Sequence, residues 1–256
     1  MIVNAVKDIY NKTIYATKTT LIDLVKPANE SPRHLRCGHV DQSVAMTVPS
    51  PLITPDLISS ALTYEQYVTL SAERLAQGRT TSDEANYNTP EILGYARLNL
   101  ARMSRLDRQT VLLPEVTAAL AQIPESWVWL VLTESWCGDA AQSVPVLQQM
   151  ALAAPQIEIR FLLRDQQPAV MNAYLTNGGK SIPKLVCLRQ SDLSRELGTW
   201  GPRPANLQAL MEDWKTEQIP FQEVIERVQR WYNTDRTLSI QRELLDLVTS
   251  WSEVSV

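Results

Sequence analysis

The chain has 256 residues, of which 45% are hydrophobic and 20% are charged, a composition typical of globular proteins and unlike that of disordered chains. Its net charge of −4 gives no general attraction to nucleic acid or to anionic lipid, so we expect neither as a partner. The three cysteines, Cys37, Cys137 and Cys187, are too few for a disulfide scaffold and favour a reducing compartment, by default the cytoplasm.

Residues 1–55 are predicted to be an extension or linker, because residues 27–55 hold five of the fifteen prolines and show little hydrophobic periodicity. Charged residues interrupt the apolar stretches near the start, so we expect no signal peptide. No run in the chain approaches the ~20 apolar residues of a membrane span. Met46 lies inside this segment, and the sequence leaves open whether translation of the natural protein starts at Met46 or at Met1.

A small cluster of metal-binding residue types lies in this linker, where His34 and His39 flank Cys37. A zinc site needs a fourth ligand, for which only Asp41 is near. We therefore predict no metal site and no cofactor. A role for Cys37 as the resolving partner of Cys137 is disfavoured as well.

Residues 56–122 have the pattern of a helical region packed on the core. Thr63 and Gln66 form a capping-box pattern ahead of an apolar repeat, and Gly78 is expected to end that helix. Thr89 and Pro90 supply the N-cap and first residue of a second helix. A third helix is predicted over residues 114–122.

The second of these helices carries four arginines, which offer either an anion-binding face or a solvated flank. Because the whole chain is acidic, we favour the solvated flank. The arginines are Arg97, Arg102, Arg105 and Arg108.

Residues 128–145 carry the most informative pattern in the chain. An apolar, β-rich run over 128–132 is followed by Trp136, Cys137 and Gly138 and then by helical periodicity, which predicts a strand, a tight turn and a helix that begins at the cysteine. The unpaired N–H groups and the dipole of a helix start stabilise an anion, so we expect Cys137 to have a lowered pKa and to be a nucleophile. Asp139 opposes this shift by its negative charge.

The following segment alternates between strands and helices. We predict a strand over 157–163, a helix over 170–175 capped by Asp165 and ended by residues 177–179, two strands over 185–188 and 193–197 that form a hairpin, and a helix over 204–215. Cys187 lies in an apolar strand and is read as a small buried hydrophobe. Residues 217–256 predict two amphipathic helices that pack on the core or on a partner.

The Trp136-Cys137-Gly138 turn, followed by Ile182-Pro183 at the start of another apolar run, resembles the thioredoxin family. The resemblance covers roughly residues 125–215 and implies a thioredoxin-like α/β fold, a central mixed sheet flanked by helices, within a domain of residues 123–216. It also implies that Pro183 is cis and faces the cysteine. The local sequence around Cys137 and the loop over 198–204 are similar to a bacterial subgroup that has an added N-terminal helical region.

Two departures from the family pattern remove its dithiol machinery. The position of the second, resolving cysteine is Ala140, and the position of the buried proton-shuttling aspartate is Val131. No disulfide can therefore form within this motif.

We expect Cys137 to act as a single reactive cysteine in monothiol exchange or in peroxide scavenging, with protein thiols or disulfides or a small thiol as partner. Trp136, Gly138, Ile182, Pro183 and Trp200 are expected to hold that partner. The competing interpretation is a redox-inactive module that binds a peptide in the same groove. The oligomeric state is left open.

Overall fold

A computed structural model describes residues 52–254 of the chain. The expectations for residues 1–51, including the role of Met46 and the cluster around Cys37, lie outside the described residues. No helix within 52–254 is both long and apolar enough to cross a membrane.

Four strands form one mixed sheet in the order β2-β1-β3-β4. They are β1 (Trp127–Thr133), β2 (Ile157–Leu163), β3 (Lys184–Arg189) and β4 (Asp192–Trp200). β1 pairs in parallel with β2 and antiparallel with β3, and β3 and β4 form an antiparallel hairpin. Every residue of β1 is buried, as expected of a central strand covered on both faces. This is the predicted thioredoxin-like α/β fold.

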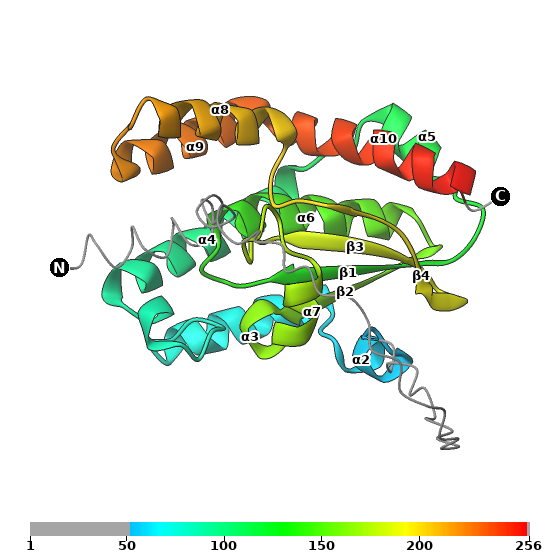
Figure 1. Cartoon of the computed structure of the whole chain (residues 1–256), viewed down its shortest axis with the longest axis horizontal. Coiled ribbons are helices and arrows are strands. Elements are labelled where there is room, and N and C mark those ends of the chain that lie inside the picture. Colours follow the sequence, from blue (N-terminus) through cyan, green and yellow to red (C-terminus); the bar gives the residue numbers. More distant parts are fainter. Residues whose placement is uncertain (1–51, 255–256) are drawn as a thin grey trace, which may run out of the picture.

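Helices cover both faces of the sheet, with α6 (Gly138–Ala153), α5 (Pro114–Leu120) and α10 (Leu238–Val254) on one side and α2 (Pro55–Ser60), α3 (Tyr64–Ala76) and α7 (Pro168–Ala173) on the other (Figure 1). Two short 3₁₀ turns, η1 (Ala85–Tyr87) and η2 (Arg164–Gln166), and the helix α8 (Ala205–Thr216) complete the connections.

The prediction for Asp165 is wrong, because this residue lies within η2 and Gln167 is the N-cap of α7. The Asp165 carboxylate accepts hydrogen bonds from Ser82 Oγ and from Arg164 Nε instead. It therefore ties the N-terminal region to the sheet and caps no helix. The helix itself ends at Ala173, two residues before the predicted end, and Asn177 and Gly178 form a turn with positive φ angles.

The N-terminal helices begin and end where local sequence signals predict. Thr63 and Gln66 make both hydrogen bonds of a capping box at the start of α3, and Thr89 caps α4 (Pro90–Gln109) ahead of its proline. The segment between α2 and α3 also pairs with the sheet, since Leu62 and Phe161 exchange backbone hydrogen bonds of 2.9 and 2.8 Å. This bridge covers part of the exposed edge of β2.

The two C-terminal helices are α9 (Phe221–Asp235) and α10, as the amphipathic pattern predicts. α10 packs against α5, α6 and β4, and Trp251 makes an edge-on ring contact with Trp127 in β1 at 6.2 Å. α9 lies beside α8. In the described chain, α10 is therefore part of the hydrophobic core.

Candidate functional site around Cys137

Cys137 is the N-cap residue of α6, at the end of the loop that leaves β1. Its sulfur accepts a hydrogen bond from Ala140 N–H at 3.5 Å, and its S–H donates to the carbonyl of Ile182 at 3.2 Å. The Ile182–Pro183 peptide bond is cis. The strand, turn and helix predicted from the sequence thus bring the cysteine against the dipeptide 45 residues away.

The loop after β4 packs closely behind Pro183. Gly201 has φ +110°, and a Cβ atom on it would lie 2.2 Å from the carbonyl oxygen of Pro183. Only glycine accommodates both the backbone angle and this contact. The loop then delivers Arg203 to the start of α6.

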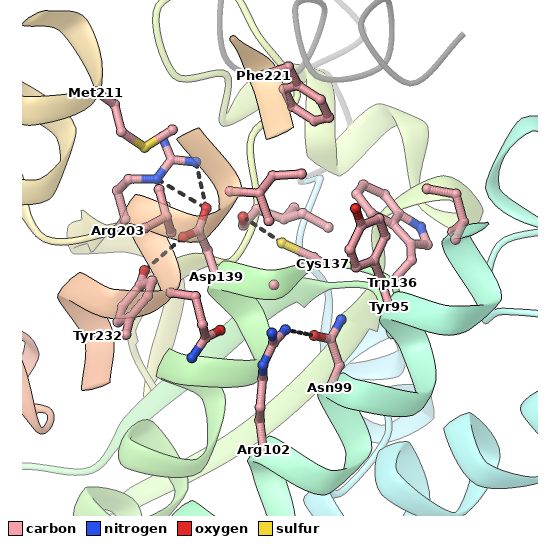
Figure 2. Close-up of a pocket in the computed structure, with 16 residues that line it drawn as sticks. Tyr95, Asn99, Arg102, Trp136, Cys137, Asp139, Arg203, Met211, Phe221 and Tyr232 are labelled. Atoms are coloured by element: carbon pink, nitrogen blue, oxygen red, sulfur yellow. Dashed lines mark hydrogen bonds and ion pairs between the residues drawn. The ribbon is translucent and has the colours of Figure 1, made fainter. Parts of the chain in front are cut away.

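A cavity of about 170 Å³ lies over Cys137 (Figure 2). Its walls come from α4, the start of α6, α8, α9 and the residue before Pro183. The polar and charged lining residues are Tyr95, Asn99, Arg102, Cys137, Asp139, Arg203, Gln229 and Tyr232, and the larger apolar ones are Ile92, Trp136, Ile182, Met211, Phe221, Ile225 and Val228. An engineered cavity of about 150 Å³ in another protein holds one benzene molecule, so a cavity of this volume suits a compact ligand or side chain.

Of the expected partner-binding residues, Trp136, Gly138 and Ile182 line this cavity, whereas Pro183 and Trp200 are buried and do not. The indole N–H of Trp200 donates to Glu243 Oε2 on α10 at 2.8 Å. Trp200 therefore joins the end of β4 to α10 and lies outside the cavity wall.

Three residues from distant parts of the chain form a buried polar cluster beside Cys137. Arg203 donates to Asp139 Oδ2 from two nitrogens at 3.0 and 2.5 Å, and Tyr232 O–H donates to Asp139 Oδ1 at 2.7 Å. The side chains of Arg203 and Asp139 are 4% and 13% exposed. Sequence reasoning weighed Asp139 alone, because its partners are 64 and 93 residues away and no local pattern links them.

The structure reverses the expected direction of the Cys137 pKa. The residue is only 7% exposed, and burial, followed by the charge of Asp139, raises the pKa of the thiol to about 12. Hydrogen bonds from the backbone at the helix start and the charge of Arg203 lower it, but by less. Cys137 is thus a protonated thiol at neutral pH, since desolvation outweighs the helix terminus.

Trp136 is held by a stack on the side of the N-terminal region. Its ring lies parallel to that of Tyr87 at 4.3 Å, and the guanidinium group of Arg164 lies 4.7 Å from its centroid. Asn99 on α4 donates to the carbonyl of Ser135 in the same loop at 3.0 Å. The turn that carries Cys137 is therefore fixed by Tyr87 and Asn99, which precede β1, together with Arg164, which follows β2.

The site residues that sequence reasoning missed come mainly from α4 and α9. Tyr95, Asn99 and Arg102 follow the spacing i, i+4, i+7, which places them on one helix face, and all three line the cavity. The spacing was a usable signal, but assigning the arginines of this helix to a solvated flank concealed it.

Within residues 52–254 no group of three or more His, Cys, Asp or Glu side chains is arranged to hold a metal ion. The candidate ligands His34, Cys37 and His39 lie outside this range.

A family model described as Thioredoxin matches residues 87–215. Two solved structures are similar at 15% sequence identity: a protein of unknown function from Pseudomonas aeruginosa, with a TM-score of 0.45 over 73% of this chain and 97% of that one, and an HIV epitope scaffold, with a TM-score of 0.44 over 73% and 98%. No curated protein matches the chain.

Proposed function

Because the chain belongs to the thioredoxin family, we propose that it uses Cys137 as a single reactive thiol that exchanges with disulfides, without a resolving cysteine in its own motif. The main support for this proposal is the cavity, because Cys137 lines it at the start of α6. Trp136, Gly138 and Ile182 form the walls against which the partner lies.

The surroundings of Cys137 support exchange with an external partner. Ala140 occupies the resolving position, and Cys187 is fully buried in β3, where burial raises its pKa. Within the described part of the chain, Cys137 and Cys187 are both free thiols. A second sulfur therefore has to come from outside residues 52–254.

The reaction balances as a two-step exchange. The Cys137 S–H first loses its proton to solvent. The thiolate then attacks one sulfur of the partner disulfide, so that a bond between Cys137 and that sulfur forms as the S–S bond of the partner breaks. The second sulfur of the partner leaves as a thiolate and takes a proton from water. An external thiol then attacks the mixed disulfide and regenerates Cys137. We place this chemistry in a reducing compartment such as the cytoplasm, which supplies that thiol.

The raised pKa makes this exchange slow in the resting protein. At pH 7 a thiol with a pKa of about 12 is ionised to only about one part in 10⁵, since each unit corresponds to a factor of ten. We therefore expect rates that climb with pH and partners that bind in the cavity before they react.

The test is adduct formation with bis(2-hydroxyethyl) disulfide, a small neutral disulfide, in a Cys37→Ser background. Intact mass and peptide mapping at pH 7 to 10 should find one adduct, on Cys137, in this parent and in Cys187→Ser, and none in Cys137→Ser. Added thiol should remove it. Absence of an adduct across this pH range in the folded protein, or modification of Cys187 alone, would refute the exchange.

The second candidate is a redox-inactive binding module, which the burial and raised pKa of Cys137 favour. In that case ligands bind in the cavity without covalent modification. Binding would survive in Cys137→Ala, and no disulfide would label the wild type.

A further inference from the structure

Arg102 enters the cavity from α4 as a half-buried cation. Figure 2 shows its guanidinium group directed towards the start of α6, and Nη1 donates to Asn99 Oδ1 at 2.8 Å. Burial and the neighbouring Arg105 lower its pKa, and it forms no ion pair with any carboxylate in residues 52–254. The solvated-flank reading of the sequence therefore fails for this residue.

The charges around the cavity do not cancel. Arg203 is neutralised by Asp139, whereas the charge of Arg102 is left over, so two arginines face one aspartate in the lining. A buried or half-buried cation without a counter-ion is costly, and a ligand anion removes that cost.

Asn99 holds Arg102 in this position. Its amide nitrogen donates to Ser135 O, so that its oxygen is left to accept from Arg102, and its side chain is buried. One residue thus fixes both the loop that carries Trp136 and Cys137 and the direction of the guanidinium group. Asn99 is a positioning residue for the cation.

From this geometry we propose that the cavity selects a small disulfide or thiol that carries a carboxylate, with the carboxylate at Arg102 and the sulfur at Cys137. The apolar walls formed by Ile92, Phe221 and Val228 accommodate a short aliphatic link between the two ends. The sulfur end of this inference rests on the proposed exchange reaction, whereas the anion end does not.

The experiment compares two symmetrical disulfides of similar length and opposite charge, 3,3′-dithiodipropionate and cystamine, at pH 8. Each rate of Cys137 adduct formation in the Cys37→Ser parent is divided by the rate of a free small-molecule thiol with the same reagent. We expect the normalised rate to be about tenfold higher for the dicarboxylate, a difference of about 1.4 kcal/mol. Equal rates would overturn the inference.

Matched variants locate the effect. Arg102→Gln should abolish the preference and Arg102→Lys should retain part of it, whereas Arg105→Gln removes the same charge one turn away and should leave it unchanged. Arg105 lies outside the lining of this cavity. The inference would fail if the preference for the dicarboxylate persisted in Arg102→Gln. It would also fail if Arg105→Gln abolished this preference as completely as Arg102→Gln does, because general surface charge would then select the reagent.

Binding without chemistry separates this inference from the proposed function. Propionate titrated into the Cys137→Ser protein should perturb the NMR signal of the Trp136 indole, and Arg102→Gln should remove the effect. Such binding, with no adduct from any disulfide, would support the anion site and overturn the exchange. Adducts at equal normalised rates, without propionate binding, would support the exchange and overturn the anion site.

Discussion

At the scale of single residues, the reactivity of Cys137 depends on charges that the rest of the fold brings to it. Asp139 raises the pKa of the thiol and Arg203 lowers it, and the two are ion-paired with each other. Removing the charge of Asp139 should therefore lower the pH midpoint of Cys137 alkylation, and removing the charge of Arg203 should raise it.

Asp139→Asn should lower the pKa of Cys137, because the Arg203 cation then faces the sulfur without an opposing carboxylate. For each unit of the shift, the alkylation rate by iodoacetamide at a pH below the midpoint should rise about tenfold. The measurement is the rate against pH, with peptide mapping to identify Cys137.

Arg203→Gln is the reciprocal control and should raise the midpoint. Breaking a buried ion pair costs about 3–5 kcal/mol, so both variants are first checked by thermal unfolding. If both variants accelerate alkylation at the same pH, loosened packing rather than charge explains the result.

Ala140→Cys should form a disulfide with Cys137 and give weak insulin-disulfide reductase activity. Ala140 N–H already contacts the sulfur at 3.5 Å, and positions three residues apart at a helix start lie on one face. Ala140→Ser, which adds a similar atom without a thiol, should stay inactive like the wild type. Turnover by the wild type would contradict this account of the missing cysteine.

At the scale of elements, α9 is the feature that encloses the site. Phe221, Ile225 and Val228 on this helix line the cavity, and Figure 2 shows Phe221 above Cys137. Access to the sulfur thus depends on a helix that lies outside the matched family region, which ends at residue 215.

Phe221→Ala should speed alkylation of Cys137 severalfold and lower the pH midpoint, because it opens access to the sulfur and lessens the burial that raises the pKa of the thiol. The matched control is Gln222→Ala, a change at an exposed neighbour on the same helix that should have no effect. Unchanged rates in Phe221→Ala would mean that the reagent reaches Cys137 by another route.

At the scale of the whole molecule, a buried polar network joins the N-terminal region to the thioredoxin-like part. Glu134 is fully buried, accepts hydrogen bonds from Thr81 Oγ1 and from Asp165 N–H, and lies three residues before Cys137. Burial is the main cause that raises the pKa of its carboxyl from 4.5 to about 7.

This shift predicts stability that falls as pH rises. Because the folded state holds the Glu134 proton up to about pH 7 and the unfolded state releases it near 4.5, unfolding is increasingly favoured across that window and the effect is constant above it. The expected loss is about 3 kcal/mol, taking about 1.4 kcal/mol per unit.

Glu134→Gln should remove that part of the pH dependence. Urea unfolding at pH 5 and pH 8 measures the difference, and Glu65→Gln, at an exposed position of α3, is the control. An identical pH dependence in Glu134→Gln and in the parent protein would show that another group is responsible.

Local sequence signals determined the elements of this fold. An apolar, β-rich run marked β1 and apolar alternation marked β2. The Thr63–Gln66 box and the Thr89–Pro90 pair marked helix starts, and Cys137 was placed at the start of α6. Each of these features depends on residues within a few positions of one another, so a single sequence contains the information. The thioredoxin-like arrangement was implied by the resemblance of the Trp136-Cys137-Gly138 and Ile182-Pro183 motifs to that family.

Tertiary structure decided the chemistry of the site. The sign of the Cys137 pKa shift depends on burial under α9 and on Asp139, and the polar neighbours Arg203, Tyr232 and Arg102 come from three other segments. Asp165 makes a long-range contact with Ser82 instead of the local capping role assigned to it, and Trp200 donates a hydrogen bond to Glu243 on α10. Desolvation and charge pairing act between groups that are close in space, and those distances are set only by the packing of the complete fold.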